Sequence, residues 1–568
     1  MDSLSAFLRD TPLGQGLRWA TNKQVLKFPE ERPGFKLPSP YHNGADIHDT
    51  VGETLSRSTS DREQDEEREN SAVGPSGDDL QSRLPPDIET GLSFPASACI
   101  LVDWYGDDDA ENPHSWPTWK KAYVHLSINI YTFAIYMSSS IYTPAAPALM
   151  EIYGISHMVA SLGLGLYVLG YAIGPLVFGP PSEIASVGRN PVYVITMFLF
   201  VLLSVPAALS DNMPGFMILR FLQGFFGSPG LANGGGSIGD ITTTRVLPYA
   251  LYLWAFFPLA GPSVGPMIAG FSVTAKNWRW AMWEIVWIAG LSFVNLLLLP
   301  ETSSSNILYR RAGRLRALTG NPAYSSRSQI SQRHLSAARI ARMSLLVPWK
   351  INALDPSVLF TSLYCGLVYA IFYSFFEVFP LVYMDIYGMN YGEMGAVFMS
   401  VLIAVLVVGV PYMAFIHYVV NKAVREGRQL QPEVRLIPGV VASFLVPAGL
   451  FLFAWTARSD IHWVVPSLGV LLASGGVCII IQSVYVYLAM AYPQYAASLI
   501  GANTFCRGAM ALAAILWSGP LYSKLGIARG TSLLGGLCGG CIIGMFVLWL
   551  RGAELRKRSR FAVDDVGS

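Results

Sequence analysis

Beyond residue 122 the chain alternates between long apolar runs and short polar segments. An apolar run of about 18–25 residues, at a helical rise of ~1.5 Å per residue, is long enough to cross the hydrocarbon core of a membrane. One long polar break, over residues 301–354, divides the runs six and six. The pattern therefore predicts an all-α integral membrane protein with twelve transmembrane helices in two six-helix halves. The runs cover residues 123–146, 158–178, 191–209, 214–236, 247–271, 281–300, 357–384, 392–419, 436–456, 463–490, 496–520 and 530–550.

The first 119 residues contain no such run. Residues 3–31 mix apolar side chains with Arg and Lys, which suits an amphipathic helix on an anionic membrane surface and equally an unstructured tail. Residues 42–90 are predicted to be disordered because they are strongly charged and poor in apolar residues. The first long apolar run begins only near Tyr123, so we expect no signal peptide and a cytosolic N-terminus.

Charge follows the same division of the chain. The net charge of +1 combines −12 in residues 1–119, from 10 Lys/Arg and 22 Asp/Glu, with +13 in the remainder, from 29 and 16. Only 14% of the residues are charged and 52% are hydrophobic, against ~25% charged residues in soluble domains. The composition excludes a basic nucleic-acid binder and a fibrous protein. We expect an acidic, largely disordered cytosolic tail (1–119), an N-terminal half (120–300), a basic cytosolic linker (301–354), a C-terminal half (355–550) and a cytosolic C-terminal tail (551–568).

The orientation follows from the distribution of Lys and Arg, which are enriched in cytosolic loops. With the N-terminus inside, the predicted inner loops and the C-terminal tail hold 20 Lys/Arg, and the outer loops hold five. An error of one span would remove this bias. The asymmetry therefore predicts an even number of spans with both termini in the cytosol.

Three charged residues remain inside the predicted spans: Arg220 in span 4, Glu377 in span 7 and Arg507 in span 11. An ionisable group in the hydrocarbon region costs at least a few kcal/mol and usually faces a cavity or a partner. These residues are the strongest candidates for proton coupling. Burial would favour the protonated form of Glu377 and make it a plausible proton carrier, and its pairing with a distant Arg is the alternative.

Span 7 also carries aromatic residues three and four positions apart, so several of them share the helix face of Glu377. Such rings can line a cavity for planar or cationic organic molecules through stacking and cation–π contacts. Helix–helix packing is the alternative for each ring. The candidate cavity residues are Tyr369, Phe372, Tyr373 and Phe376 in span 7, Gln482 and Tyr485 in span 10, and Asn503 in span 11.

Three motifs resemble signatures of the major facilitator superfamily. The loop after span 2 has a glycine, an acid and a Gly-Arg pair (Gly179, Glu183, Gly188, Arg189), although Glu replaces the usual Asp, two extra residues precede the pair, and Ile184 stands where a basic residue is usual. In the family this loop is a conformational latch. Span 4 has the RxxQG signature (Arg220, Gln223, Gly224), for which simple binding of Arg220 to backbone carbonyls is the alternative. Span 5 has the GPxxGP signature of antiporters (Gly261, Pro262, Gly265, Pro266).

Together with FLRDTPLGQGLRWATNK near the N-terminus and FYSFFEVFPLVY in span 7, these motifs resemble the fungal twelve-span drug:H⁺ antiporters, in the benomyl/fluconazole-resistance branch. Close relatives often have Asp after the Asn of span 11, whereas this chain has Thr504, which leaves Arg507 without an obvious local partner. The resemblance implies the major facilitator fold, a monomer in the plasma membrane, and proton-coupled export of drugs, fungicides or a secondary metabolite or toxin. Arg220 would then tune the proton affinity of Glu377 if the two come close.

Other functions remain as alternatives. A proton-coupled uptake carrier for a nutrient or polyamine would share the fold, and a membrane receptor could use the N-terminal tail for signalling. The chain contains no P-loop, metal-ligand cluster or nucleophile constellation, so we expect no enzyme activity, no cofactor and no metal. The expected partners are a small organic molecule, protons and the lipid bilayer, with no nucleic acid.

Overall fold

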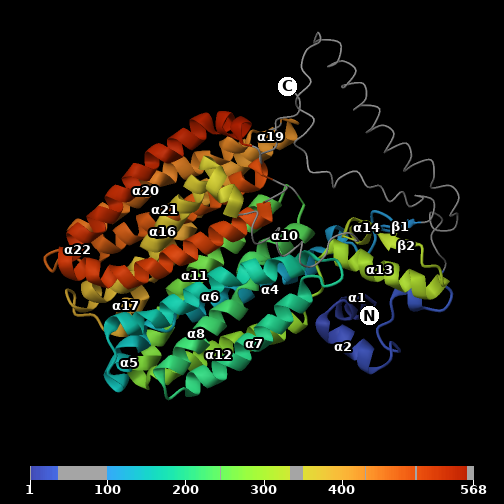
Figure 1. Cartoon of the computed structure of the whole chain (residues 1–568), viewed down its shortest axis with the longest axis horizontal. Helices are drawn as coiled ribbons and strands as arrows, with labels where there is room; N and C mark the ends of the chain where they lie inside the picture. Colours follow the sequence, from blue (N-terminus) through green and yellow to red (C-terminus); the bar gives the residue numbers. More distant parts are fainter. Residues whose placement is uncertain are drawn as a thin grey trace, which may run out of the picture. The chain divides into compact units, whose positions relative to one another are not determined.

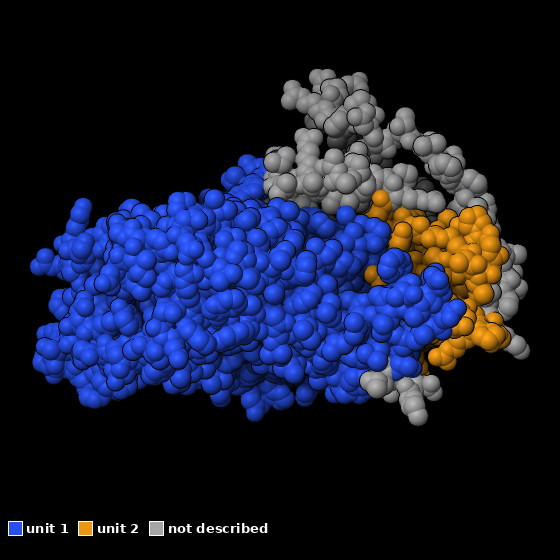
Figure 2. All heavy atoms as spheres, turned by 90° about the horizontal axis from the view of Figure 1, so that it is seen from below, with its two compact units in different colours: residues 1–26, 110–306, 334–568 blue, residues 27–109, 307–333 orange. Residues whose placement is uncertain are grey.

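The computed structural model of the chain describes residues 2–35, 99–243, 245–332, 349–428, 430–492 and 496–559. It divides into two compact units, which are coloured separately in Figure 2. Unit 1 comprises residues 1–26, 110–306 and 334–568, and it contains the membrane-spanning helices. Unit 2 comprises residues 27–109 and 307–333.

The N-terminal half of unit 1 is built from the first six predicted spans, drawn in cyan to green in Figure 1. Span 4 is divided into three short helices. The first break lies just before Pro229, where a single residue separates α8 from α9, and the second lies at Asn233. The helix N-termini on the predicted outer side are capped by side-chain oxygens, Ser156 for α6 and Asn212 for α8. The elements are α4 (Thr118–Ser140), η5 (Thr143–Ala145), α5 (Ala146–Tyr153), α6 (His157–Glu183), α7 (Asn190–Leu209), α8 (Met213–Gly227), α9 (Pro229–Ala232), α10 (Gly234–Ile241), α11 (Leu247–Ala275) and α12 (Trp278–Leu297).

The C-terminal half repeats this arrangement from Pro356 onward. Asp355 caps its first helix by accepting hydrogen bonds from the backbone N–H groups of Ser357 and Val358. The last two spans run as one long element, α22, with a break in helical geometry at Gly526, where φ is 75°. The elements are α16 (Pro356–Phe379), the π-helical turn η6 (Pro380–Met384), α17 (Tyr391–Val397), α18 (Met399–Phe415), η7 (Ile416–Val420), α19 (Asn421–Arg425), η8 (Pro432–Leu436), α20 (Ile437–Thr456), α21 (Val464–Ala491) and α22 (Ala496–Arg558).

Nine helical stretches of the described residues are long and apolar enough to cross a membrane. They account for ten of the twelve predicted spans, because the stretch Leu499–Lys557 contains spans 11 and 12. The other two are α4, which is rich in Ser, Thr and Tyr, and span 4, which is broken into short helices. The all-α membrane fold that the hydrophobic pattern predicts is thus confirmed.

Two further helices, α1 (Asp2–Arg9) and α2 (Pro12–Ala20), belong to unit 1 and precede the first span. Lys120 at the start of α4 forms an ion pair with Asp10, between α1 and α2, at 3.2 Å. This part of the N-terminal tail is therefore helical. The segment 42–90, for which disorder is predicted, lies outside the described residues.

Unit 2 joins the tail to the linker between the halves. Strand β1 (Ile100–Val102) pairs in parallel with β2 (Tyr324–Ser326), and Arg311 on helix α13 (Ser304–Thr319) binds Asp109 at 2.6 Å. Arg314, on the same helix, binds Glu30 in η1 (Pro29–Glu31) at 3.1 Å. Helix α14 (Arg327–Gln332) follows β2. Described residues 27–35 and 99–109 of the tail and 307–332 of the linker thus form a small folded unit, which composition alone does not predict.

Candidate functional site

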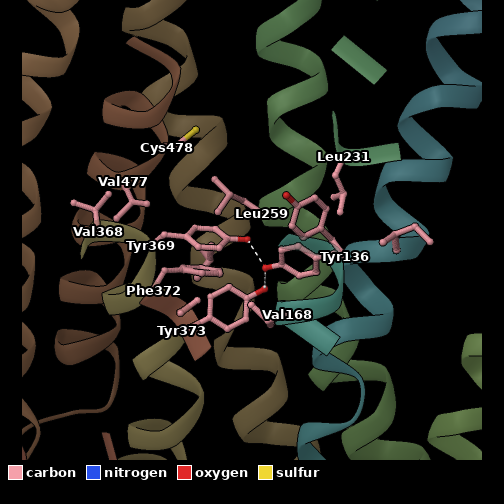
Figure 3. Packing of buried hydrophobic residues seen from close by; sticks show 14 of the residues in the cluster. Tyr136, Val168, Leu231, Leu259, Val368, Tyr369, Phe372, Tyr373, Val477 and Cys478 are labelled. Atoms are coloured by element: carbon pink, nitrogen blue, oxygen red, sulfur yellow. Dashed lines mark hydrogen bonds between the residues drawn. The ribbon is translucent and has the colours of Figure 1, made fainter. Parts of the chain in front are cut away.

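Three tyrosine hydroxyls join the two halves near the middle of α16. Tyr171 on α6 hydrogen-bonds to the hydroxyl of Tyr369 at 2.8 Å and to that of Tyr373 at 2.9 Å. All three side chains are buried, and the ring of Tyr136 on α4 lies 5.7 Å from that of Tyr171. Figure 3 labels Tyr136, Tyr369 and Tyr373 of this cluster and marks hydrogen bonds with dashed lines. Polar groups from both halves therefore meet inside an otherwise apolar interface.

The aromatic residues predicted on span 7 come together in the structure. The ring of Tyr373 lies 5.1 Å from that of Tyr369 and 5.5 Å from that of Phe376, and the rings of Phe372 and Phe376 are 6.1 Å apart. Phe376 also stacks on Phe398, at 4.9 Å, within the C-terminal half. Phe376 thus contributes to helix packing within the C-terminal half, whereas Tyr369 and Tyr373 face the N-terminal half.

Arg507 on α22 is a buried charge with no counter-ion among the described residues. Its guanidinium lies 4.7 Å from the ring centre of Tyr369 and 5.3 Å from that of Tyr485 on α21. Its Nε atom is buried and has no hydrogen-bond partner in the described part of the chain. Cation–π contacts contribute about 2 kcal/mol when desolvated, whereas burying an ion costs several kcal/mol. The aromatic rings therefore compensate the charge only in part.

Glu377 on α16 contacts the N-terminal half through α6. One carboxylate oxygen accepts a hydrogen bond from the Ser161 hydroxyl at 2.9 Å, and the other lies 3.5 Å from Nε2 of His157. The Glu377 side chain is 8% exposed and the His157 side chain 62% exposed. Among the described residues Glu377 forms an ion pair with neither Arg220 nor Arg507. The acid is thus buried, but its histidine neighbour is accessible.

Arg220 on α8 is fully enclosed by the N-terminal half. It donates hydrogen bonds to the backbone carbonyls of Gly163, Ser138 and Ser139 at 3.0–3.1 Å, and to the side chain of Gln223 at 3.3 Å. Each backbone partner belongs to α4 or α6. This geometry favours the interpretation in which Arg220 ties three helices together.

Comparison with known proteins identifies the family. The family model described as Major Facilitator Superfamily matches residues 128–515. The chain belongs to this superfamily. It is 48% identical to the MFS-type transporter pyvG of Aspergillus violaceofuscus, over 99% of this chain and 100% of that protein. It is 38% identical to fluconazole resistance protein 1 of Saccharomyces cerevisiae, over 81% of this chain and 84% of that protein.

Solved structures agree with this family fold. The partially occluded, inward-open structure of the xylose transporter XylE from E. coli matches with a TM-score of 0.54 at 14% sequence identity, covering 76% of this chain and 98% of that one. The chain is therefore a multi-pass membrane transporter of small molecules with the major facilitator fold, related to fungal drug-resistance transporters.

The superfamily loop after α6 forms an ion-paired junction between helix ends. The Nε of Arg189 donates to Asp240, at the end of α10, at 2.6 Å, and Glu301 accepts from the backbone N–H groups of Arg189 and Asn190 at 3.2 and 3.1 Å. Burial alone would lower the pKa of the Arg189 guanidinium, but the adjacent Asp240 carboxylate raises this pKa above its ordinary value. Asp240, which lies outside the loop motif, is thus an ion-pair partner of Arg189.

Within this loop, Gly188 adopts a left-handed φ of 82° close to Glu301. A side chain would be strained in this conformation and would collide with the Glu301 carboxylate. Gly179 and Glu183 lie in the last turn of α6. A glycine is therefore required at position 188, because Glu301, in the connection between α12 and α13, approaches its backbone closely.

The GPxxGP motif lies in α11 where that helix packs closely on α4. Gly261 and Gly265 face the backbone of Met137, and a Cβ atom at either position would collide with it. Pro262 and Pro266 lie inside the continuous helix. Further along α11, Gly270 lies against the backbone of Tyr391 in the other half. The motif thus permits the close approach of helices on the predicted outer side.

The remaining predicted cavity residues have different surroundings. The Tyr485 hydroxyl hydrogen-bonds to Thr504 at 3.2 Å, beside Arg507. Asn503 is fully buried and directs its amide toward Thr361 and Ser362 on α16, at 3.5 Å. Gln482 is buried on α21, and Gln223 and Gly224 lie on α8 with Arg220. Only Tyr485 among them joins the cluster around Arg507.

Four residues of the site were not predicted from the sequence: Tyr136, Tyr171, His157 and Ser161. The sequence-based candidates were the charged residues inside the spans and a set of polar and aromatic residues in spans 7, 10 and 11, whereas these four neutral or weakly basic side chains lie in or next to spans 1 and 2. Their functional context comes only from the packing of α4 and α6 against the other half. A search for polar residues on spans 1 and 2 that fall at the same depth as the charged residues would have found them.

Proposed function

We propose that this chain is a proton-coupled antiporter that exports small organic compounds from the cytosol by alternating access. The observation that carries the proposal is the contact of Glu377 with Ser161 and His157, because it places a buried, titratable acid across the two halves. The name of the Saccharomyces relative, a fluconazole resistance protein, supports a xenobiotic or toxic compound as the cargo.

The contact between Glu377 and Ser161 provides a way to couple proton uptake to the conformational change. Opening the predicted outer side separates α16 from α6, breaks the Ser161–Glu377 hydrogen bond and exposes the carboxylate to water. A proton taken up there neutralises Glu377, and a neutral acid costs much less to bury again than an ion. The halves can then close with the proton bound, and its release on the cytosolic side completes the exchange for outgoing cargo.

We further propose that both termini are cytosolic and that the protein resides in the plasma membrane. The excess of Lys and Arg in the predicted inner loops supports this orientation. The basic residues of α13 in unit 2 belong to the same side as the N-terminal tail with which they pair.

Drug accumulation in intact cells tests the proposal. Yeast deleted for its own drug pumps would express the chain and be loaded with radiolabelled fluconazole or cycloheximide. We expect lower accumulation than in cells without the chain, and recovery to the control level when a protonophore collapses the proton gradient. Reduced accumulation that persists after collapse of the gradient would rule out antiport, and increased accumulation would favour the uptake alternative.

A further inference from the structure

We propose that Arg507, with the tyrosine hydroxyls around it, is a binding subsite for a hydrogen-bond acceptor of the transported molecule, such as a carbonyl, a carboxylate or an aromatic ring nitrogen. The preferred cargo is then neutral or anionic rather than cationic. This inference deepens the proposed function, since it names the chemical class that the transporter carries.

The first observation is that Arg507 has no hydrogen-bond acceptor among the described residues. The residue is 8% exposed, and its Nε atom is buried without a hydrogen-bond partner among the described residues. The faces of Tyr369 and Tyr485 lie beside its guanidinium. A buried guanidinium carries five N–H donors in a planar fork, and proteins rarely leave such donors unsatisfied. A ligand with an acceptor atom would satisfy these N–H donors.

Arg220 provides the contrast within the same molecule. It too is a buried arginine on a membrane-spanning helix with two tyrosine rings beside it. Its fork, however, is occupied by three backbone carbonyls. Burial in the bundle therefore does not prevent an arginine from finding acceptors, and their absence at Arg507 distinguishes this residue.

The second observation is the position of Arg507 between the halves. Tyr369, which lies under its guanidinium, hydrogen-bonds to Tyr171 of the N-terminal half. Tyr485 bonds to Thr504, one turn from Arg507 on α22. A molecule held at this point would contact hydroxyls of both halves, and it would replace the Tyr369–Tyr171 hydrogen bond when the halves separate.

The charge of the site sets its selectivity. In a buried environment of low dielectric constant, the guanidinium binds a carbonyl or carboxylate more strongly than it would in water, and its planar fork suits two parallel hydrogen bonds. The same charge repels an organic cation. The aromatic rings would otherwise accept both kinds of molecule, so Arg507 is the element that discriminates between them.

The test is direct binding to the purified full-length protein in lipid nanodiscs, which needs no proton gradient. The acceptor probes are cycloheximide, fluconazole and salicylate, and the cation probe is tetraphenylphosphonium. We expect saturable binding of at least one acceptor probe, weakened tenfold or more by Arg507→Met and less by Arg507→Lys, which keeps the charge but loses the fork. Binding of tetraphenylphosphonium should be unchanged or tighter in Arg507→Met.

Arg458→Gln, at an exposed position in an outer loop, is the matched control and should bind all probes as the wild type does. The proposal is overturned if Arg507→Met binds the acceptor probes normally, if it loses both kinds of probe equally while unfolding at the wild-type temperature, or if the wild type binds none of the acceptor probes. If the protein binds them through Arg507 but does not export them from cells, the proposed function fails and this inference stands.

Discussion

The three charged residues inside the bundle differ in what surrounds them. Arg220 is satisfied by carbonyls of α4 and α6, and Glu377 bonds across the halves to Ser161. Among the described residues, Arg507 contacts aromatic faces and has no acceptor. Counting charges in the apolar runs was enough to select all three. It could not assign their roles, because each role depends on partners from other helices that carry no formal charge, such as a backbone carbonyl or a serine hydroxyl.

Arg220 is expected to contribute mainly to stability. Arg220→Ala removes the donor of three buried carbonyls, and unsatisfied buried polar groups cost about 1–3 kcal/mol each. We expect the variant to be destabilised by at least ~3 kcal/mol, observed as a clearly lower unfolding temperature of the purified protein. Arg279→Ala is the control, since this arginine pairs with the exposed Asp211 and such surface pairs contribute at most ~1 kcal/mol. Equal unfolding temperatures for the two variants would contradict the structural role.

Among the single elements, helix α2 is unusual because its polar side chains are buried against the protein and its apolar side chains are exposed. Thr11 and Arg18 are buried against the protein, whereas Leu13, Leu17 and Trp19 are 44%, 49% and 84% exposed. The helix lies beside α7 and α12, next to the ends predicted to be cytosolic. An apolar outer face is stable at this position if it contacts lipid. Of the two sequence-based interpretations of residues 3–31, the structure thus favours the membrane-surface helix.

Accessibility of Trp19 tests the position of α2. A polarity-sensitive fluorophore would be attached at Trp19→Cys, in a Cys99→Ser background because Cys99 is the exposed native thiol among the described residues. In nanodiscs we expect strong quenching by lipids with a shallow nitroxide and little quenching by aqueous iodide. The same label at Arg327→Cys, an exposed position on α14, should show the reverse. Equal quenching by iodide at both positions would place α2 in water.

At the scale of the whole molecule, the fold was predictable because the hydrocarbon core fixes the length of each span, and the runs of apolar residues record that length. The breaks inside the spans were not predictable from the apolar runs. Span 4 is interrupted around Pro229 by local backbone geometry, and its apolar composition is unaffected. Nor could the pairing of Glu30 and Asp109 with Arg311 be read from the sequence, because about 200 residues or more separate the partners and only the folded chain brings them together.

The proposed role of Glu377 is to couple proton movement to export. It is tested most directly in proteoliposomes that contain the purified protein and have an acidic lumen, with uptake of radiolabelled fluconazole as the readout. Wild-type protein and the control Glu151→Gln, at an exposed position on the predicted outer side, should accumulate the compound in response to the pH gradient. Glu377→Gln should lose this response and still equilibrate the compound without a gradient. Accumulation by Glu377→Gln at the wild-type level would show that Glu377 is not the coupling acid.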